Sequence, residues 1–142
     1  MNREILFRGK TKNRKNNDWI YGSLVRGVSK YDYEPTTFIY ELHTEIDGRG
    51  WIDNYWGEEV DPETVGQYTG LTDINGVKIF EGDVFSNRHV VTYLANYNDG
   101  LGMNAGWYTQ RDNFESWSEL ECEQWHEVLG NKWDNPELVE VQ

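Results

Sequence analysis

The sequence predicts a mainly β protein, β-rich α+β at most, built as a small barrel or sandwich of short antiparallel strands with minor helix. Short runs rich in β-branched and aromatic residues recur along the chain, and turn-forming residues separate them. Aromatic residues make up 15% of the 142 residues, with seven Trp and nine Tyr. Disordered chains are poor in such residues, so we expect a folded core.

A chain of this length forms one domain, residues 1–142, or at most two β-rich halves, about 1–58 and 59–142. Cys122 is the only cysteine, which excludes an intrachain disulfide and a cysteine-based zinc site. No apolar run reaches the roughly 20 residues that cross a bilayer. The N-terminus lacks the apolar segment of a signal peptide, so we expect a cytoplasmic protein.

The N-terminal part is predicted to hold three strands. Residues 5–8 and 19–25 form an antiparallel pair, and the polar, basic residues 9–18 form a long loop between them. Residues 36–42 form the third strand. The Gly, Asp and Asn residues at 48–54 predict irregular chain there.

Turn signals organise the middle of the chain. Asp61 can cap free N–H groups and Pro62 suits a first helical position, so a helical turn is expected at 61–64. The Asn-Gly pair within residues 73–76 predicts a tight hairpin turn. A further turn at 81–83 leads into strands at 84–85 and 89–94.

The last third predicts fewer regular elements. Residues 95–112 have the composition of a long loop, interrupted by Trp107 and Tyr108. A capping-box spacing from Ser116 to Glu119 predicts a short helix at 114–121. A final strand is expected at 125–129, ended by Gly130-Asn131, and a second helical turn at 135–138.

Several segments together resemble a known family. Residues 65–71, 73–76 and 79–84 carry its central Tyr-Thr-Gly and Glu-Gly-Asp motifs, and residues 3–10 match its N-terminus. Residues 127–131 and 135–138 match its ending, whereas Lys132, Trp133 and Asp134 depart from it. These segments resemble the YopX family of phage and prophage proteins, which has no assigned biochemical activity. The resemblance implies a single YopX-like domain acting in the cytoplasm of a bacterial host.

The polar residues of the central motif are candidates for a partner-binding surface. They are Gln67, Tyr68, Thr69, Asp73, Glu81 and Asp83. The alternative is structural, because carboxylates in turns commonly accept hydrogen bonds from nearby backbone N–H groups. The glycines of the motif are best explained as turn and close-packing positions.

Large aromatic residues outside the predicted strands are a second candidate surface. Trp51, Trp56 and Trp107 lie in segments rich in Gly, Asp or Asn, and such residues often anchor protein interfaces. Through them the protein can form a homo-oligomer, a dimer or a ring. The alternative is that they cover the ends of a barrel.

The charge distribution suggests a third kind of site. Residues 1–30 contain eight basic and two acidic residues, a net of +6, whereas residues 31–142 contain five basic and 23 acidic residues, a net of −18. The basic loop can reach successive phosphates, with Trp19 or Tyr21 as a stacking face. Its candidate phosphate contacts are Lys10, Lys12, Arg14 and Lys15. The acidic remainder either imitates nucleic acid or only confers solubility.

The sequence gives little support to an enzyme. His43, His89 and His126 are isolated, and no phosphate-binding loop, dinucleotide fingerprint or nucleophile elbow is present. Asp73-x-Asn75-Gly76 fails the calcium-loop pattern because Gly stands fourth rather than sixth. We therefore expect no enzymatic activity, metal or cofactor, and a regulatory or binding protein that acts through protein–protein contacts. The alternative is a nucleic-acid-associated module that uses the basic loop 10–15.

Overall fold

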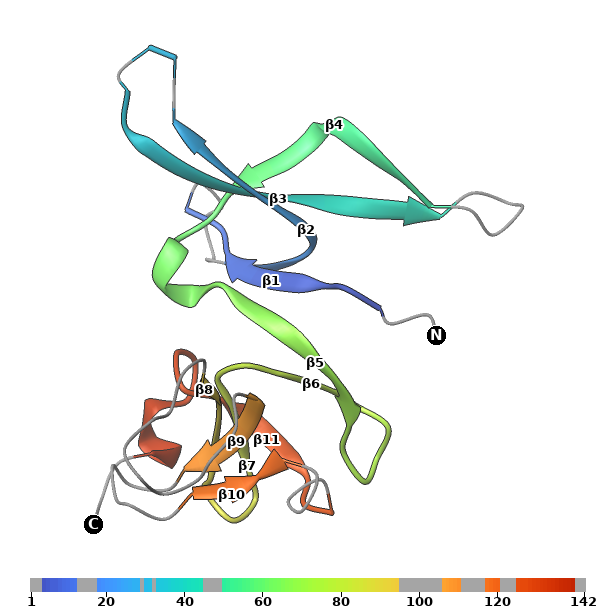
Figure 1. The fold of residues 1–142 in the computed structure, drawn as a ribbon, viewed down its shortest axis with the longest axis vertical. Coiled ribbons are helices and arrows are strands. Elements are labelled where there is room, and N and C mark those ends of the chain that lie inside the picture. Colours follow the sequence, from blue (N-terminus) through green and yellow to red (C-terminus); the bar gives the residue numbers. More distant parts are fainter. Residues whose placement is uncertain are drawn as a thin grey trace. The chain divides into compact units, whose positions relative to one another are not determined.

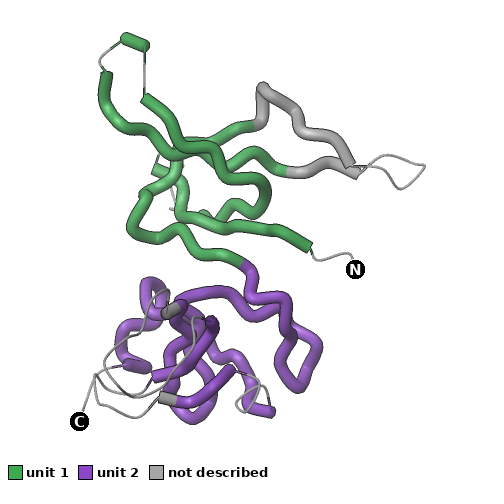
Figure 2. Tube along the Cα trace, in the orientation of Figure 1, with its two compact units in different colours: residues 1–67 green, residues 68–142 purple. Residues whose placement is uncertain are grey.

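The computed structural model confirms a mainly β fold (Figure 1). It describes residues 4–12, 18–28, 30–31, 33–44, 50–94, 106–110, 117–120 and 125–139, with the side chains of residues 42–44, 50–56, 94 and 117 outside that description. In these residues antiparallel strands and two short 3-10 turns make up the regular structure, and no helix of seven or more residues occurs. The chain divides into two compact units, residues 1–67 and 68–142 (Figure 2).

The first unit is an antiparallel meander. Its elements are β1 (Phe7–Lys10), β2 (Trp19–Val28), β3 (Pro35–Thr44), β4 (Gly50–Glu59), the 3-10 turn η1 (Pro62–Thr64) and the start of β5 (Gly66–Thr72). Each strand from β1 to β4 pairs with the next along the chain, and β1 also pairs with the start of β5. Ile20, Ile39 and Val60 form the buried core of this unit. The pairings from β1 to β4 are hairpins in succession, whereas the β1–β5 pairing joins residues about 60 positions apart, as in Phe7 opposite Gln67.

The predicted pair of N-terminal strands is confirmed, but its loop is shorter than expected. Lys10 lies opposite Trp19 in the β1–β2 ladder, so the strand continues through Gly9 and Lys10. Thr11 then forms an isolated bridge with Val60. The connection begins later than its polar composition suggested, because backbone pairing rather than side-chain polarity sets the strand end.

The prediction of irregular chain at 48–54 is wrong from residue 50 onward. Residues 50–59 form β4, which pairs with β3 from Phe38 opposite Glu59 to Thr44 opposite Gly50. The register shifts between Tyr40 and Leu42. Such a bulge absorbs residues that fit a regular strand poorly, so tertiary pairing overrides the weak strand propensity of Gly, Asp and Asn.

The second unit contains an open sheet. Its elements are the rest of β5, β6 (Lys78–Phe80), β7 (Asp83–Phe85), β8 (Val90–Leu94), β9 (Gly106–Gln110), β10 (Trp117–Glu119), β11 (Val128–Asn131) and the 3-10 turn η2 (Pro136–Leu138). The strand order β10-β9-β8-β7-β11 leaves β10 and β11 at the edges of the described sheet, so it is not a closed barrel. Ile79, Phe85, Val91 and Leu120 form the buried core.

Three C-terminal predictions need correction. The expected loop at 95–112 contains a strand, β9, which pairs with β8 from Val90 opposite Gln110. Residues 117–119 of the expected helix form β10, which pairs with β9, while Ser116 of its capping box lies outside the described residues. The final strand is shifted to Val128–Asn131. Pairing with other strands determines the structure of all three segments, and the pattern of apolar residues in a short segment does not predict such pairing.

The predicted turns are confirmed in detail. Asp61 caps η1, because its Oδ1 accepts a hydrogen bond from Glu63 N at 3.1 Å. In the turn of residues 73–76, Gly76 has a φ of 81° and its N–H donates to the carbonyl of Asp73. The turn at 81–83 depends on Gly82, whose φ of 92° lies in the left-handed region. A side chain there would also collide with the ring of Trp133.

Gly82→Ala should therefore destabilise the fold through both backbone and packing. Gly70 has a similar φ of 90°, but an added Cβ would meet no other atom within 4 Å, so it is a matched control. We expect Gly70→Ala to lower the free energy of unfolding by about 1–2 kcal/mol, from the left-handed backbone alone. Gly82→Ala should cost roughly 1–3 kcal/mol more, because the methyl group overpacks against Trp133. Urea denaturation measures both, and equal losses would contradict the packing role of Trp133.

Candidate functional site

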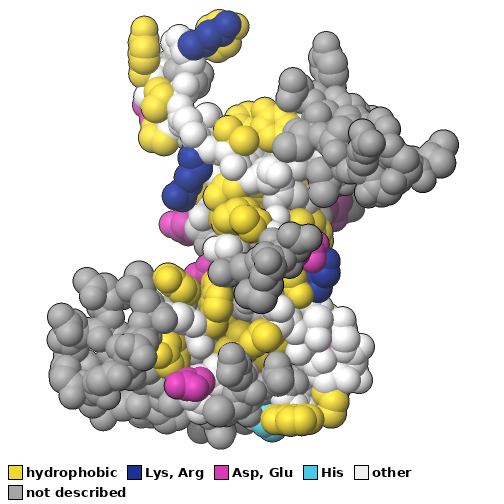
Figure 3. Space-filling model, turned by 45° about the vertical axis from the view of Figure 1, so that its right-hand side comes forward, with side chains coloured by type: hydrophobic (Ala, Val, Ile, Leu, Met, Phe, Trp, Pro, Cys, Tyr) yellow, Lys and Arg dark blue, Asp and Glu magenta, His cyan; other side chains and the backbone are white. Residues whose placement is uncertain are grey.

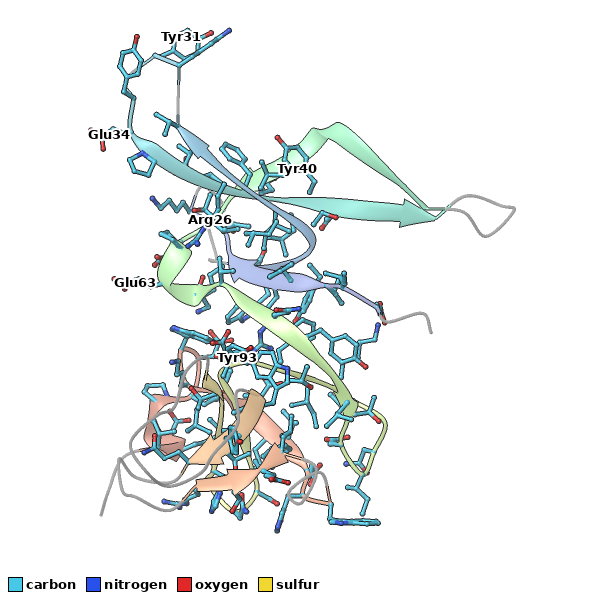
Figure 4. All side chains as sticks on the ribbon, viewed as in Figure 1. Arg26, Tyr31, Glu34, Tyr40, Glu63 and Tyr93 are labelled. Carbon is cyan, nitrogen blue, oxygen red and sulfur yellow. The ribbon has the colours of Figure 1, made fainter. Side chains whose placement is uncertain are left out.

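A long exposed hairpin in the first unit is the strongest candidate interaction surface. We call residues 25–38, from the end of β2 to the start of β3, the hairpin arm. The two strands stay paired as far as Val28 opposite Pro35, and the arm continues to Tyr31 at its far end (Figure 4). Figure 1 shows the arm extending away from β1. Its length follows from β2 and β3, which have ten residues each.

The arm exposes apolar and aromatic side chains. Tyr31 is 85% exposed and Tyr33 is 79% exposed, and both Val25 and Val28 are also exposed. Tyr33 has a φ of 57°, which is uncommon for a residue other than Gly. The Nζ of Lys30 lies 5.2 Å from the centroid of the Tyr31 ring. Hydrophobic and basic side chains thus lie together at the end of the arm (Figure 3).

A hollow of about 250 Å³ lies at the base of the arm. Its lining comes from β2, β3, the end of β4, the segment that follows β4 and Lys12 after β1. The lining residues are Lys12, Arg26, Gly27, Pro35, Thr36, Thr37, Glu59, Val60 and Pro62. The hollow therefore combines two cations, one carboxylate, two hydroxyl groups and apolar side chains.

Strand alternation explains why Arg26 faces this hollow. Leu24, Arg26 and Val28 alternate along β2 and therefore share one face of the hairpin. They lie opposite Ile39, Thr37 and Pro35, respectively. Ile39 is fully buried and Leu24 packs against the core, so one face runs from the core through Arg26 and Thr37 to the exposed Val28.

The ions of the hollow are unequally paired. Lys12 Nζ lies 3.4 Å from Glu59 Oε2 in a partly exposed ion pair. Among the residues that the structure describes, the Arg26 side chain has no hydrogen-bond or ion-pair partner. The Thr37 hydroxyl also has no partner within the described chain. Within the described chain, none of the five N–H donors of the Arg26 guanidinium is therefore engaged.

The cations of the predicted basic loop are placed differently from one another. Lys10 Nζ lies 5.7 Å from the centroid of the Trp19 ring, and the buried Arg8 stacks on the same ring at 4.7 Å. Lys12 is paired with Glu59. Arg14 and Lys15 lie outside the described residues. Trp19 thus holds cations of β1, rather than lying open as a stacking face.

The motif residues of the second unit gather around the β5–β6 hairpin. The Tyr68 ring lies 5.6 Å from the ring of Phe80. Thr69 Oγ1 donates to the carbonyl of Ile79 at 2.8 Å. Asp83, which is 3% exposed, accepts a hydrogen bond from Phe80 N at 2.8 Å. Thr69 and Asp83 therefore form hydrogen bonds with backbone groups. This agrees with the structural alternative given for the motif residues in the sequence analysis.

Asp73 accepts hydrogen bonds from three backbone N–H groups. It is 6% exposed, and its Oδ1 accepts from Asn75 N and Val77 N while its Oδ2 accepts from Val128 N at 2.9 Å. Burial acts to raise the pKa of Asp73, but the three N–H donors stabilise its charged form. The net effect is a pKa below the usual value for this carboxyl.

The remaining candidates differ from one another in their surroundings. Gln67 is half-buried opposite Phe7 in the β1–β5 ladder, and Glu81 is half-buried in the turn after β6. Trp107 packs against the core of the second unit, and its ring meets that of Tyr93 edge-on at 5.0 Å. Trp51 and Trp56 belong to β4, and their side chains lie outside the described residues.

The histidines show no catalytic arrangement among the described residues. His89 Nδ1 lies 3.0 Å from Thr109 Oγ1, and His126 Nδ1 lies 3.5 Å from Ser86 Oγ. The described part of the chain contains no cluster of three or more His, Cys, Asp or Glu side chains that could hold a metal. Nor does it contain a helix long and apolar enough to cross a membrane.

Sequence reasoning missed the hairpin arm and Arg26. The available signal was the segment from residue 28 to 35, where two Tyr residues occur in a polar turn that ends at Pro35. A turn normally carries small polar residues, so large aromatic side chains there indicate a surface role. No local sequence pattern predicted the position of the Arg26 side chain, because the face on which it lies depends on the register between β2 and β3.

Comparison with protein families matches the YopX protein family over residues 6–140. The chain belongs to this family. The family description states no activity. Among solved structures, the chain is similar to the crystal structure of protein EF1440 from Enterococcus faecalis, with 15% identity, 98% of this chain and 100% of that chain covered, and a TM-score of 0.43. The search of curated proteins gives no match.

The role of Asp73 predicts a pH-dependent stability difference. Asp73→Asn removes a charged acceptor of three N–H groups, so the free energy of unfolding at pH 7 should fall by about 1–3 kcal/mol. Because the folded pKa of Asp73 is lowered, its stabilisation is present above about pH 4 and is lost as pH falls through that lowered pKa. The difference in free energy of unfolding between the variant and the parent protein should therefore be smaller at pH 3 than at pH 7.

Urea denaturation at pH 7 and pH 3 measures this difference. Asp61→Asn is the control, because Asn caps a helical turn about as well as Asp and no change is expected. A difference that persists unchanged at pH 3 would show that Asp73 stabilises the fold by packing rather than by its charge.

Proposed function

We propose that this YopX-family protein is a non-enzymatic phage or prophage accessory protein that acts in the bacterial cytoplasm by binding another protein or a second copy of itself. The hairpin arm is the contact surface. The observation that carries this proposal is the exposure of Tyr31 and Tyr33 at the end of a paired hairpin. Aromatic side chains held clear of the core in this way supply binding area to a partner.

The energetics favour such a role for the arm. A Tyr side chain has only two side-chain torsions to fix on binding and brings both an apolar ring and a polar hydroxyl. Alanine scans find that Tyr residues at the centre of an interface are often worth about 2 kcal/mol or more each. Val25 and Val28 extend the apolar contact toward the base of the arm.

Nucleic-acid binding through Lys10, Lys12, Arg14 and Lys15 is the alternative. The favouring observation is the net charge of +6 over residues 1–30. Against it, Lys10 lies against Trp19, Lys12 is paired with Glu59, and the whole chain carries −12. A negative net charge repels a polyanion at long range, so this alternative ranks second.

The proposal predicts loss of binding when the arm aromatics are removed. Tagged protein is used to capture partners from bacterial lysate with and without nuclease, and light scattering gives its own assembly state. We expect the double change Tyr31→Ser and Tyr33→Ser to weaken the nuclease-resistant partner or the homo-oligomer at least tenfold. Trp125→Ser is the matched control, because Trp125 is 71% exposed and lies in the other unit.

Three outcomes would overturn the proposal. They are a monomer that captures nothing, a double variant that binds as well as the parent protein, and an equal loss in Trp125→Ser. Capture that disappears with nuclease would replace it with the nucleic-acid alternative.

A further inference from the structure

We infer that the hollow at the base of the hairpin arm takes a side-chain carboxylate from an acidic, extended segment of the protein partner. The inference rests on the proposed function, since it assigns the chemistry of the partner that meets the arm. It assigns the hollow as an anion subsite, with Arg26 as the principal contact. Charge, size and the surrounding side chains each support it.

Charge comes first. Arg26 and Lys12 bring two positive charges to the lining, and Glu59 brings one negative charge. Lys12 has three donors and is engaged with Glu59, whereas Arg26 has no partner within the described residues. The planar guanidinium matches a carboxylate in a two-bond geometry, and such charge-assisted bonds are about twice as strong as neutral ones.

The hydroxyl of Thr37 adds a neutral donor. Thr37 lies directly opposite Arg26 in the β2–β3 ladder, so both side chains are on the same face of the hairpin. Its hydroxyl makes no bond to another described residue. An anion bound to Arg26 can thus accept a second hydrogen bond from Thr37 without any rearrangement of the backbone.

Size limits what the hollow can hold. Its volume of about 250 Å³ is below the roughly 300–1,000 Å³ of pockets that enclose whole small molecules. One side chain fits better than a cofactor or a nucleotide. Val60, Pro35 and Pro62 provide apolar contact for the methylene groups that carry a side-chain carboxylate.

The surroundings favour a peptide over nucleic acid. On the same face, the next cross-strand pair beyond Arg26 and Thr37 is Val28 and Pro35, both exposed. An extended peptide repeats its side chains every second residue, so an acidic residue at Arg26 places an apolar residue near Val28. A nucleic acid gains affinity from many phosphate contacts, and the hollow offers a single cation without a partner in the described chain.

The test uses the full chain and a synthetic probe. The probe is a fluorescein-labelled acetyl-Val-Ser-Glu-Ser-Val-amide peptide, which places Glu and both Val side chains on one face when extended. It is compared with the same peptide carrying Gln in place of Glu and with a ten-residue oligothymidylate. Fluorescence anisotropy gives the affinity, and amide chemical shifts of the ¹⁵N-labelled protein give the position. We expect the acidic peptide to bind at least tenfold more tightly than its Gln counterpart and to shift the signals of Arg26 and Thr37.

Variants isolate the contribution of Arg26. Arg26→Ala and Arg26→Gln should each weaken the acidic peptide about tenfold, and Thr37→Val should weaken it less. Lys132→Ala causes the same change in net charge within the other unit and should leave the affinity unchanged. Arg26 is exposed, so the variants should fold, and circular dichroism checks this.

Each result decides the inference separately from the proposed function. Equal loss in Lys132→Ala, equal binding of the Gln peptide, or no binding by the parent protein would overturn the carboxylate subsite. If oligothymidylate instead shifts Arg26 and Thr37 more strongly than the peptide, the hollow binds phosphate. If the peptide test fails but the Tyr31 and Tyr33 double variant still loses the captured partner, the carboxylate subsite is overturned and the proposed function is retained.

Discussion

The carboxylate of Asp73 accepts hydrogen bonds from two N–H groups of its own turn and from Val128, which lies 55 residues later in the chain. This buried charge fixes the β5–β6 turn and at the same time holds the start of β11. Since a buried carboxylate without partners is costly, the turn and the strand are stable only together. Asp73 thus links the beginning of the second unit to its end through one side chain.

A second constraint acts at Gly82. Its N–H donates to the carbonyl of Val91 and its carbonyl accepts from Lys132 N, while the ring of Trp133 occupies the place of a side chain. Polar motif residues such as Asp73 and Asp83 thus accept hydrogen bonds from the backbone of this unit and stabilise its fold. The first unit is different, because its long hairpin continues past the core and leaves side chains on both faces exposed. The proposed binding surface is therefore the arm rather than the family motif.

The features that could be predicted from the sequence are those whose interacting residues are close together in the chain. The cap at Asp61, the turn at 73–76 and the pairing of residues near 7–10 with those near 19–22 were predicted, because adjacent residues specify them. The strands at 50–59 and 106–110 were not predicted. The first contains Gly, Asp and Asn, which have weak strand propensity. In the second, Trp107, Tyr108 and Thr109 favour a strand but form only a short run. Pairing with β3 and β8 shows that both segments are extended.

By itself, the sequence determined the mainly β class, the positions of the tight turns and membership in the YopX family. Each of these depends on local backbone chemistry or on a string of residues in order. Only the tertiary structure decided that Arg26 stands opposite Thr37 at a hollow and that Tyr31 and Tyr33 extend from a paired arm. The reason is register: a shift of one residue in the β2–β3 ladder would turn Arg26 to the other face, and no local pattern fixes that choice.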